Sequence, residues 1–189
     1  MVTAKGARRR THAEQRERRA AIDDPQVVLE AAARFLEARH RSVAEVRRRL
    51  RSAGYRPDLV DGAIERLLEL GILDDEAFAR AWVESRDRAR PRGERAIREE
   101  LRVKGIDRAT IDVVLDERRE GDGAEPDRDA AERLLERNLR SLARVADPRQ
   151  RRARAYALLA RNGFDPDVCR EVAARVVDLD QPGAAPESR

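Results

Sequence analysis

The feature that most constrains this chain is a short pattern that occurs three times, around Gly54, Gly105 and Gly163. In each copy a leucine lies four residues before the glycine, and an aromatic or branched apolar residue follows the glycine directly. Glycine readily adopts the left-handed conformation that ends many helices, and an Asp soon after the turn favours the start of another helix. The pattern therefore predicts three pairs of helices, each pair joined by a tight turn.

A longer helical segment precedes each pair, over residues 26–38, 76–88 and 127–144. Because no stretch shows the period-2 alternation of β-branched residues that is typical of strands, helix is the only regular structure that we expect. Repeats of this size bury their cores within themselves and against their neighbours. The sequence therefore predicts an all-α fold of three tandem three-helix repeats that form an elongated, curved array.

Changes in composition mark the ends of these repeats. The first 20 residues carry seven Lys and Arg against two Glu and lack apolar residues at helical spacing, which indicates disorder. The last ten residues contain two prolines and one glycine, which is typical of a frayed tail. We expect a basic disordered arm, three repeats of which the last is divergent, and a flexible tail, at residues 1–24, 25–71, 72–120, 121–179 and 180–189.

The composition excludes several classes of protein. A single cysteine, Cys169, rules out an intrachain disulfide or a cysteine-based zinc cluster, and the two histidines, His12 and His40, are far apart in the sequence. No apolar run approaches the roughly 20 residues of a membrane-spanning helix, and the N-terminal segment has no apolar core of a signal peptide. We therefore expect a cytoplasmic monomer without a cofactor, a metal or a membrane contact.

The sequence also lacks the arrangements that carry catalysis. It has no Gly-rich phosphate loop, no paired histidines for a metal, and no Ser or Cys nucleophile with a plausible His beside it. The acidic run Asp74-Asp75-Glu76 precedes an apolar segment, where a capping aspartate accepts hydrogen bonds from backbone amides. A structural role is therefore favoured over a metal site, and we expect a protein that is not an enzyme.

Three further motifs favour structural roles. Ser42 and Glu45 form the S-x-x-E capping pattern of a helix start. Phe78 and Trp82 lie four residues apart and so share one helix face. We assign both to the core of the second repeat, together with Ile97, Leu101, Ile106 and Ile111. Cys169 aligns with apolar residues of the other two copies, which indicates a small buried side chain.

Arginines gather beside each of the repeated turns. The chain has 41 Lys and Arg against 37 Asp and Glu, so the distribution of charge matters more than the net charge of +4. Two interpretations are open: solvated helix faces on which arginine pairs with glutamate, or a stripe of guanidinium groups that contacts phosphates or an acidic protein groove. The first is favoured for any single cluster, while recurrence at equivalent positions supports the second. The clusters lie at residues 47–51, 86–95 and 149–154.

Two stretches resemble the RecX family. Residues 41–55, R-S-V-A-E-V-R-R-R-L-R-S-A-G-Y, are similar to its first-repeat pattern R-S-x-x-E-L-x-x-K-L-x-x-K-G-F. Residues 71–79, G-I-L-D-D-E-A-F-A, and the glycines and apolar residues of 92–106 are similar to its second repeat. The resemblance covers residues 31–115 closely and 125–177 more loosely. Ala53 stands where the family has a lysine, and the third repeat keeps the Gly163-Phe164 turn but little else.

The resemblance implies three tandem three-helix repeats that bind the filament of the RecA recombinase, modulate its activities and also contact DNA. We expect inhibition of recombinase, ATPase and coprotease activities by occupation of the filament groove. The alternative is a protein that binds single- or double-stranded DNA weakly, without sequence preference, through the basic arm and the arginine clusters. The residues assigned to contact with RecA or DNA are Arg47, Arg48, Arg51, Arg92, Arg95, Lys104, Arg151 and Arg152.

Overall fold

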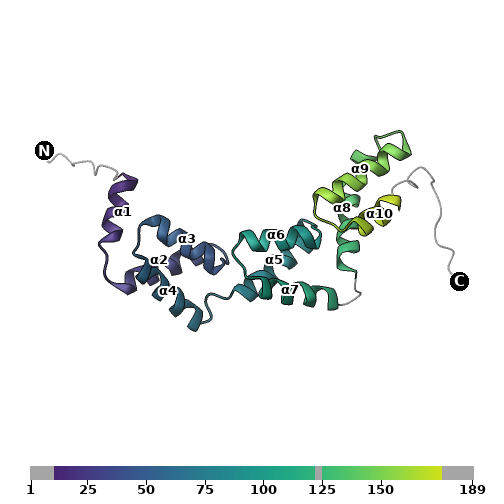
Figure 1. The fold of residues 1–189 in the computed structure, drawn as a ribbon. Coiled ribbons are helices and arrows are strands. Elements are labelled where there is room, and N and C mark those ends of the chain that lie inside the picture. Colours follow the sequence, from purple (N-terminus) through teal and green to yellow (C-terminus); the bar gives the residue numbers. More distant parts are fainter. Residues whose placement is uncertain (1–10, 122–124, 176–189) are drawn as a thin grey trace. The chain divides into compact units, whose positions relative to one another are not determined.

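The computed structural model describes residues 11–121 and 125–175, and the regular structure within these ranges is entirely α-helical (Figure 1). The expected all-α fold with three three-helix repeats is confirmed, since three helices belong to each repeat and a further helix precedes the first. The three repeated glycines have φ angles of +102°, +82° and +82°, as the predicted turns require. The flexible tail predicted at 180–189 lies outside the described residues.

The chain divides into two compact units, with the division between Phe78 and Ala79. The first unit holds four helices and the beginning of a fifth. α2 packs on both α3 and α4, and their apolar faces form one core that includes Val28, Val46, Leu50, Ile64 and Leu67. The helices of this unit are α1 (His12–Ala20), α2 (Pro25–Leu36), α3 (Val43–Ala53) and α4 (Pro57–Glu69).

Part of the segment expected to be a disordered arm is a helix, so this prediction is wrong for residues 12–20; residues 1–10 lie outside the described ranges. A capping box begins α1, because the Thr11 hydroxyl accepts from the Glu14 amide and the Glu14 carboxylate accepts from the Thr11 amide. The Arg19 guanidinium then donates to the carbonyl of Ala53, over 3.2 Å. Capping and this contact stabilise a helix that has no buried side chain of its own.

The second unit holds the remaining six helices, which form two three-helix repeats. The helix that opens the first of these repeats begins within the first unit, before Phe78. In the last repeat, a core of Leu135, Leu142, Leu159, Phe164, Cys169 and Val172 lies between its three helices. The helices are α5 (Asp75–Ala89), α6 (Glu94–Val103), α7 (Arg108–Glu120), α8 (Pro126–Leu142), α9 (Pro148–Arg161) and α10 (Pro166–Arg175).

The second and third repeats meet where backbone packs directly on backbone. The amide of Gly93 donates to the carbonyl of Asn162 over 3.0 Å, at the turn between α9 and α10. A Cβ added at Gly93 would lie 2.4 Å from the carbonyl carbon of Gly163, which no real side chain tolerates. Two glycines therefore allow the start of α6 to contact the turn of the third repeat, and they fix how these two repeats join.

Five of the six residues assigned to the core of the second repeat are buried, and Phe78 is 5% exposed. The prediction for Trp82 is wrong, because its side chain is only half-buried. Its indole N–H donates to the Glu100 carboxylate over 2.8 Å. An indole N–H needs a polar partner, and Trp82 reaches that partner only at the edge of the repeat. No helix in the described ranges is long and apolar enough to cross a membrane.

Candidate binding surfaces of the arginine clusters

The acidic run at the start of α5 is structural, as predicted. The Asp74 carboxylate accepts hydrogen bonds from the amides of Glu76 and Ala77, both over 2.9 Å, and so caps the helix. Asp75 accepts from the Val43 amide over 2.9 Å. These carboxylates therefore satisfy backbone donors, and no group of three metal-ligating side chains exists in the part of the chain that the structure describes. The Ser42 hydroxyl likewise caps α3, since it accepts from the Glu45 amide.

The first arginine cluster is partly neutralised within the first unit. Arg47 and Arg51 both bind the Asp61 carboxylate of α4, each over 3.1 Å. Arg48 lies between them in the sequence, points to solvent and forms no ion pair with any described residue. One guanidinium of the three assigned here is therefore available to a partner without breaking an existing contact.

The second cluster surrounds a carboxylate and an indole. Glu100 on α6 accepts from Arg86 over 2.5 Å and lies 3.7 Å from Arg92. The Arg86 guanidinium lies 4.1 Å, and the Lys104 ammonium 4.7 Å, from the centroid of the Trp82 ring. Of the residues predicted here, Arg92 and Lys104 are thus brought together around Glu100 and Trp82. Sequence reasoning missed this cluster because it assigned the tryptophan to the core.

Arg92 and Arg95 differ in exposure although they are three residues apart. Arg92 is half-buried and donates to the Asn162 side-chain oxygen over 2.5 Å, at the junction between the second and third repeats. Arg95 is exposed and has no ion-pair partner among residues 11–121 and 125–175. Arg92 therefore has a structural contact of its own, whereas Arg95 presents its charge to solvent.

The third cluster corrects one assignment. Arg151 is 2% exposed, and its Nε donates to the carbonyl of Val145 over 3.1 Å. A side chain buried to this degree does not reach a phosphate or a protein partner, so Arg151 is structural and holds the loop between α8 and α9. The neighbouring Arg152 is exposed and unpaired within the described chain. The amphipathic pattern of α9 explains the difference, because Arg151 shares its buried face with Ala155 and Leu159.

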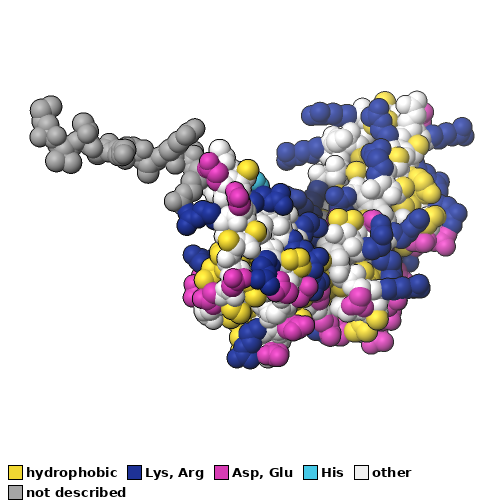
Figure 2. All heavy atoms as spheres, turned by 60° about the vertical axis from the view of Figure 1, so that its left-hand side comes forward, with side chains coloured by type: hydrophobic (Ala, Val, Ile, Leu, Met, Phe, Trp, Pro, Cys, Tyr) yellow, Lys and Arg dark blue, Asp and Glu magenta, His cyan; other side chains and the backbone are white. Residues whose placement is uncertain are grey.

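The most basic surface extends well beyond the third predicted cluster, residues 149–154. From Arg137 to Arg161 the chain has eight arginines and one acidic residue, Asp147. This segment includes the end of α8, the loop and all of α9, here called the α8–α9 hairpin. Figure 2 shows Lys and Arg side chains projecting from it at the upper right, with few Asp or Glu among them. Its exposed arginines with neither an ion pair nor a side-chain hydrogen bond in the described chain are Arg140, Arg144, Arg149, Arg152, Arg154 and Arg161, whereas Arg137 donates to two backbone carbonyls.

Most arginines of the second repeat are instead bound by acids. Arg118, with 6% of its side chain exposed, binds Asp87 over 2.8 Å and Asp127 over 2.7 Å and so connects α5, α7 and α8. Glu94 accepts from Arg119 over 2.6 Å and from Arg98 over 3.3 Å. Burial raises the pKa of Glu94, but hydrogen bonds and positive charge from these two arginines outweigh it, so its pKa lies below the ordinary value.

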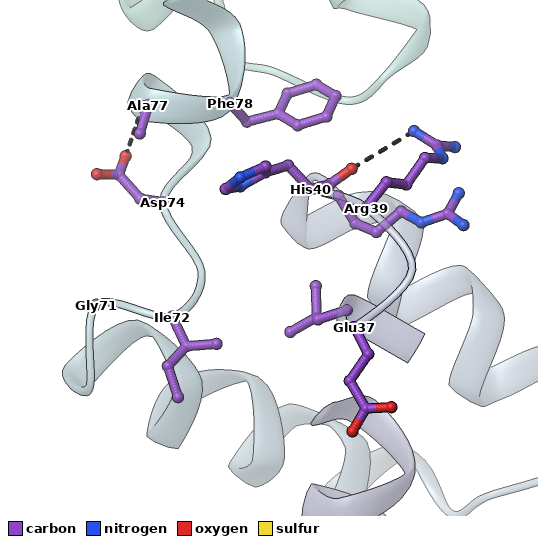
Figure 3. A pocket seen from close by; sticks show the side chains of 10 residues that line it. Glu37, Arg39, His40, Gly71, Ile72, Asp74, Ala77 and Phe78 are labelled. Atoms are coloured by element: carbon purple, nitrogen blue, oxygen red, sulfur yellow. Dashed lines mark hydrogen bonds between the residues drawn. The ribbon is translucent and has the colours of Figure 1, made fainter. Parts of the chain in front are cut away.

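The first unit also has a small recess of about 370 Å³ between the loop after α2 and the loop after α4. Figure 3 shows the rings of Phe78 and His40 on one side and Ile72 across from them. Ile72 is 54% exposed, and Arg39 contributes a guanidinium to the rim. An exposed apolar side chain beside basic groups is a composition that protein-binding surfaces share.

The lone cysteine is a buried core residue, as predicted. Cys169 is fully buried, and its thiol contacts the carbonyl of Phe164 over 3.6 Å. Burial raises the pKa of the thiol, and the negative charges of Asp165 and Asp127 add to that effect. A thiol with a raised pKa and no exposure is a poor nucleophile, so Cys169 offers no catalytic chemistry.

Three family models match the chain in order. They are described as the first, second and third three-helix domains of RecX, and they match residues 29–67, 74–115 and 125–173. Together they account for all three repeats seen in the structure.

Whole-chain comparisons find similar proteins of the same kind. "Regulatory protein RecX" of Mycobacterium avium is 36% identical over 139 residues, which is 74% of this chain and 78% of that protein. The protein of the same name from Mycolicibacterium vanbaalenii is 38% identical over 138 residues, 70% of this chain and 72% of its own. The crystal structure of RecX from Lactobacillus salivarius has a similar fold, with a TM-score of 0.69 at 23% identity, over 83% of this chain and 98% of that one.

Proposed function

The chain belongs to the RecX family, and from this premise we propose that it binds the nucleoprotein filament of the RecA recombinase and restrains strand exchange, ATP hydrolysis and coprotease activity. The relatives are named regulatory proteins, which favours a role in control over a role in catalysis. In this proposal the protein acts in the cytoplasm as a monomer and performs no chemistry. It occupies the filament groove and blocks access of DNA or client proteins.

The observation that carries this proposal is that each of the three predicted clusters has at least one exposed arginine without an ion pair in the described chain. Arg48 on α3, Arg95 on α6 and Arg152 on α9 all lie on the second helix of their repeat and are exposed. Arginine is enriched at the centres of protein interfaces, where its planar group binds carboxylates in two places. With one such group in each repeat, the chain can contact a partner made of repeating subunits at several points. Several weak contacts made together give a much higher affinity than any one of them alone.

The test is a pull-down of RecA by the full-length chain, with and without single-stranded DNA and ATP, followed by strand-exchange and ATPase assays. We expect binding to the assembled filament and inhibition at concentrations far below those that coat DNA. Two of these three arginines, Arg48 and Arg95, form the exposed set that is tested. Their charge reversal, Arg48→Glu with Arg95→Glu, should weaken inhibition more than tenfold, about 1.4 kcal/mol of binding free energy. A wild-type chain that neither binds RecA nor changes its activities would overturn the proposal.

The matched control reverses two arginines that are exposed but engaged with a neighbouring acid on their own helix. Arg66 binds Glu69 over 2.9 Å, and Arg102 binds Glu99 over 2.8 Å. The variant Arg66→Glu with Arg102→Glu changes the net charge by the same amount as the test variant. We expect it to inhibit RecA nearly as well as wild type. Equal loss in both variants would mean that overall charge, and not the exposed set, governs binding.

A further inference from the structure

The first unit has a second hollow surface, where α1 lies against the end of α3. The two helices approach so closely that a Cβ added at Gly54 would lie 2.8 Å from the backbone of Arg16. α1 nevertheless buries no side chain of its own, and recesses of about 340 Å³ and 430 Å³ lie beside this contact. Arg19 and Tyr55 line both recesses, so the two adjoin and are together called the α1 groove.

Apolar and aromatic side chains line much of the α1 groove. Phe35 of α2 and Tyr55 of the turn after α3 are both half-buried there. Leu50 and Ala53 of α3 lie beside them, and Ile22 lines the recess on the other side of Tyr55. Aromatic rings that keep part of their surface open to solvent are enriched at the centres of protein interfaces. The groove therefore offers apolar surface to a ligand.

The charged residues that line the groove are all arginines, although the chain has 37 Asp and Glu. Arg18 on α1 and Arg49 on α3 are exposed and form no ion pair within the described residues. Arg34 on α2 is exposed as well, and its nearest acid, Glu30, lies 3.9 Å away. Guanidinium groups bind carboxylates through paired hydrogen bonds, and complementary charge directs a partner to a surface. The lining therefore favours a ligand with negative charge.

The aromatic rings of the groove already contact guanidinium groups. Arg41 lies 4.3 Å and Arg49 5.7 Å from the centroid of the Phe35 ring, and Arg19 lies 5.7 Å from that of Tyr55. Single-stranded nucleic acid binds largely by stacking its bases on free aromatic faces, which these cations restrict. Apolar side chains need no such face, and carboxylates beside them would meet the arginines. An acidic segment that carries apolar side chains fits both features.

We propose that the α1 groove is a docking site for an acidic peptide segment of a partner protein. Apolar side chains of the segment contact the two aromatic rings, and its carboxylates bind Arg18, Arg34 and Arg49. The inference goes beyond the proposed regulation of RecA and does not rest on it. The exposed set assigned to that regulation, Arg48 and Arg95, does not line the groove.

The experiment measures binding of three labelled peptides of equal length to the full-length chain by fluorescence anisotropy. The first peptide combines Asp and Glu with Leu and Phe, the second has Ser in place of Leu and Phe, and the third has Gln in place of Asp and Glu. We expect the first to bind more than tenfold more tightly than either of the others, and its binding to weaken as salt is added. Equal binding of the first and second peptides would mean that charge alone is recognised, which would overturn the proposal.

A variant of the groove tests where the first peptide binds. It replaces Arg18, Arg34 and Arg49 by Gln and keeps Arg19, because the guanidinium of Arg19 donates to the Ala53 carbonyl and holds α1 in place. We expect the affinity for the first peptide to fall more than tenfold. Circular dichroism should show unchanged helicity, since the three replaced side chains are exposed. An unchanged affinity would overturn the proposal.

A control variant removes the same number of charges from exposed arginines outside the groove, each of which binds an acid on its own helix. Arg66, Arg102 and Arg108 are replaced by Gln. We expect less than a twofold change in affinity for the first peptide. If both variants lose affinity equally, the net charge of the chain and not the groove binds the peptide, and the proposal is wrong.

A competition arm identifies the class of ligand. An unlabelled single-stranded oligonucleotide is added to the complex of the wild-type chain with the first peptide, in parallel with the unlabelled peptide. We expect the oligonucleotide to need more than tenfold the concentration of the peptide for the same displacement. Equal displacement would assign the groove to nucleic acid and overturn the proposal. No recombinase is present in these measurements, so their failure refutes only the groove, whereas failure of the RecA pull-down refutes only the regulatory function.

Discussion

The second repeat and the α8–α9 hairpin use arginine in opposite ways. Residues 94–120 contain seven Lys and Arg and eight Asp and Glu, and most of these arginines bind a carboxylate. Residues 137–161 contain eight arginines and one acid. The same side chain thus connects helices in one region and presents charge to solvent in the other. A net charge of +4 for the whole chain conceals this difference, because the balanced region contributes almost nothing to it.

The largest effect that would sharpen this comparison is expected at Arg118. Arg118→Ala removes a nearly buried guanidinium and leaves Asp87 and Asp127 without their shared partner. We expect the free energy of unfolding to fall by about 3 kcal/mol, since removing one partner of a buried ion pair leaves uncompensated charge. Urea denaturation followed by circular dichroism measures it. A loss below about 1 kcal/mol would show that this arginine is no more structural than those of the hairpin.

A smaller effect is expected at Glu94 and should depend on pH. Its pKa is lower in the folded chain than in the unfolded one, so the stability it contributes is present above the unfolded value of about 4.3 and is lost as pH falls through the folded value. Glu94→Gln should therefore destabilise the protein at neutral pH by about 1 kcal/mol, typical of a charged hydrogen bond that is partly exposed. The difference from wild type should vanish in acid. Thermal melts between pH 7 and pH 3 measure it, and a constant difference would contradict the ion-pair role.

The smallest effect is expected in the hairpin. Replacing Arg140, Arg144, Arg149 and Arg152 by Gln should change the free energy of unfolding by less than about 0.5 kcal/mol, because exposed charges contribute little to stability. Removing their mutual repulsion should make any change a gain, and the gain should shrink as salt is added. The measurement is a urea titration at low and high salt. A marked loss in the free energy of unfolding would mean that these arginines stabilise the fold, as those of the second repeat do, and would contradict the comparison.

Much of the fold was predictable because its signals are local. The glycine turns, the cap at Asp74 and the buried position of Cys169 each follow from neighbouring residues and from helical spacing. The predictions that were wrong depend on contacts between residues that are distant in the sequence. The helical part of the arm is stabilised by the hydrogen bond from Arg19 to the Ala53 carbonyl. Trp82 is only half-buried, and its indole N–H donates to Glu100.

The candidate site was predicted only in part for a related reason. Aligning the three repeats directs attention to arginines that recur, and it selected Arg151, which is buried because it shares one face of α9 with Ala155 and Leu159. It passed over Arg140 and Arg144, which have no counterpart in the alignment. Counting acids along the same stretch identifies the hairpin at once, since a single aspartate stands among eight arginines. The ratio of basic to acidic residues along a stretch of sequence therefore identifies this surface, whereas alignment of the repeats does not.

The half-buried Trp82 and the buried Cys169 also provide two natural probes of unfolding. Each is the only residue of its type, and they lie in different repeats, one on α5 and one on α10. Fluorescence of the single indole, with two cations against its ring, reports on the second repeat, while the rate at which a thiol reagent labels the single cysteine reports on opening of the third. The wild-type protein is therefore sufficient to test whether the second and third repeats unfold together or one after the other, with and without a bound ligand.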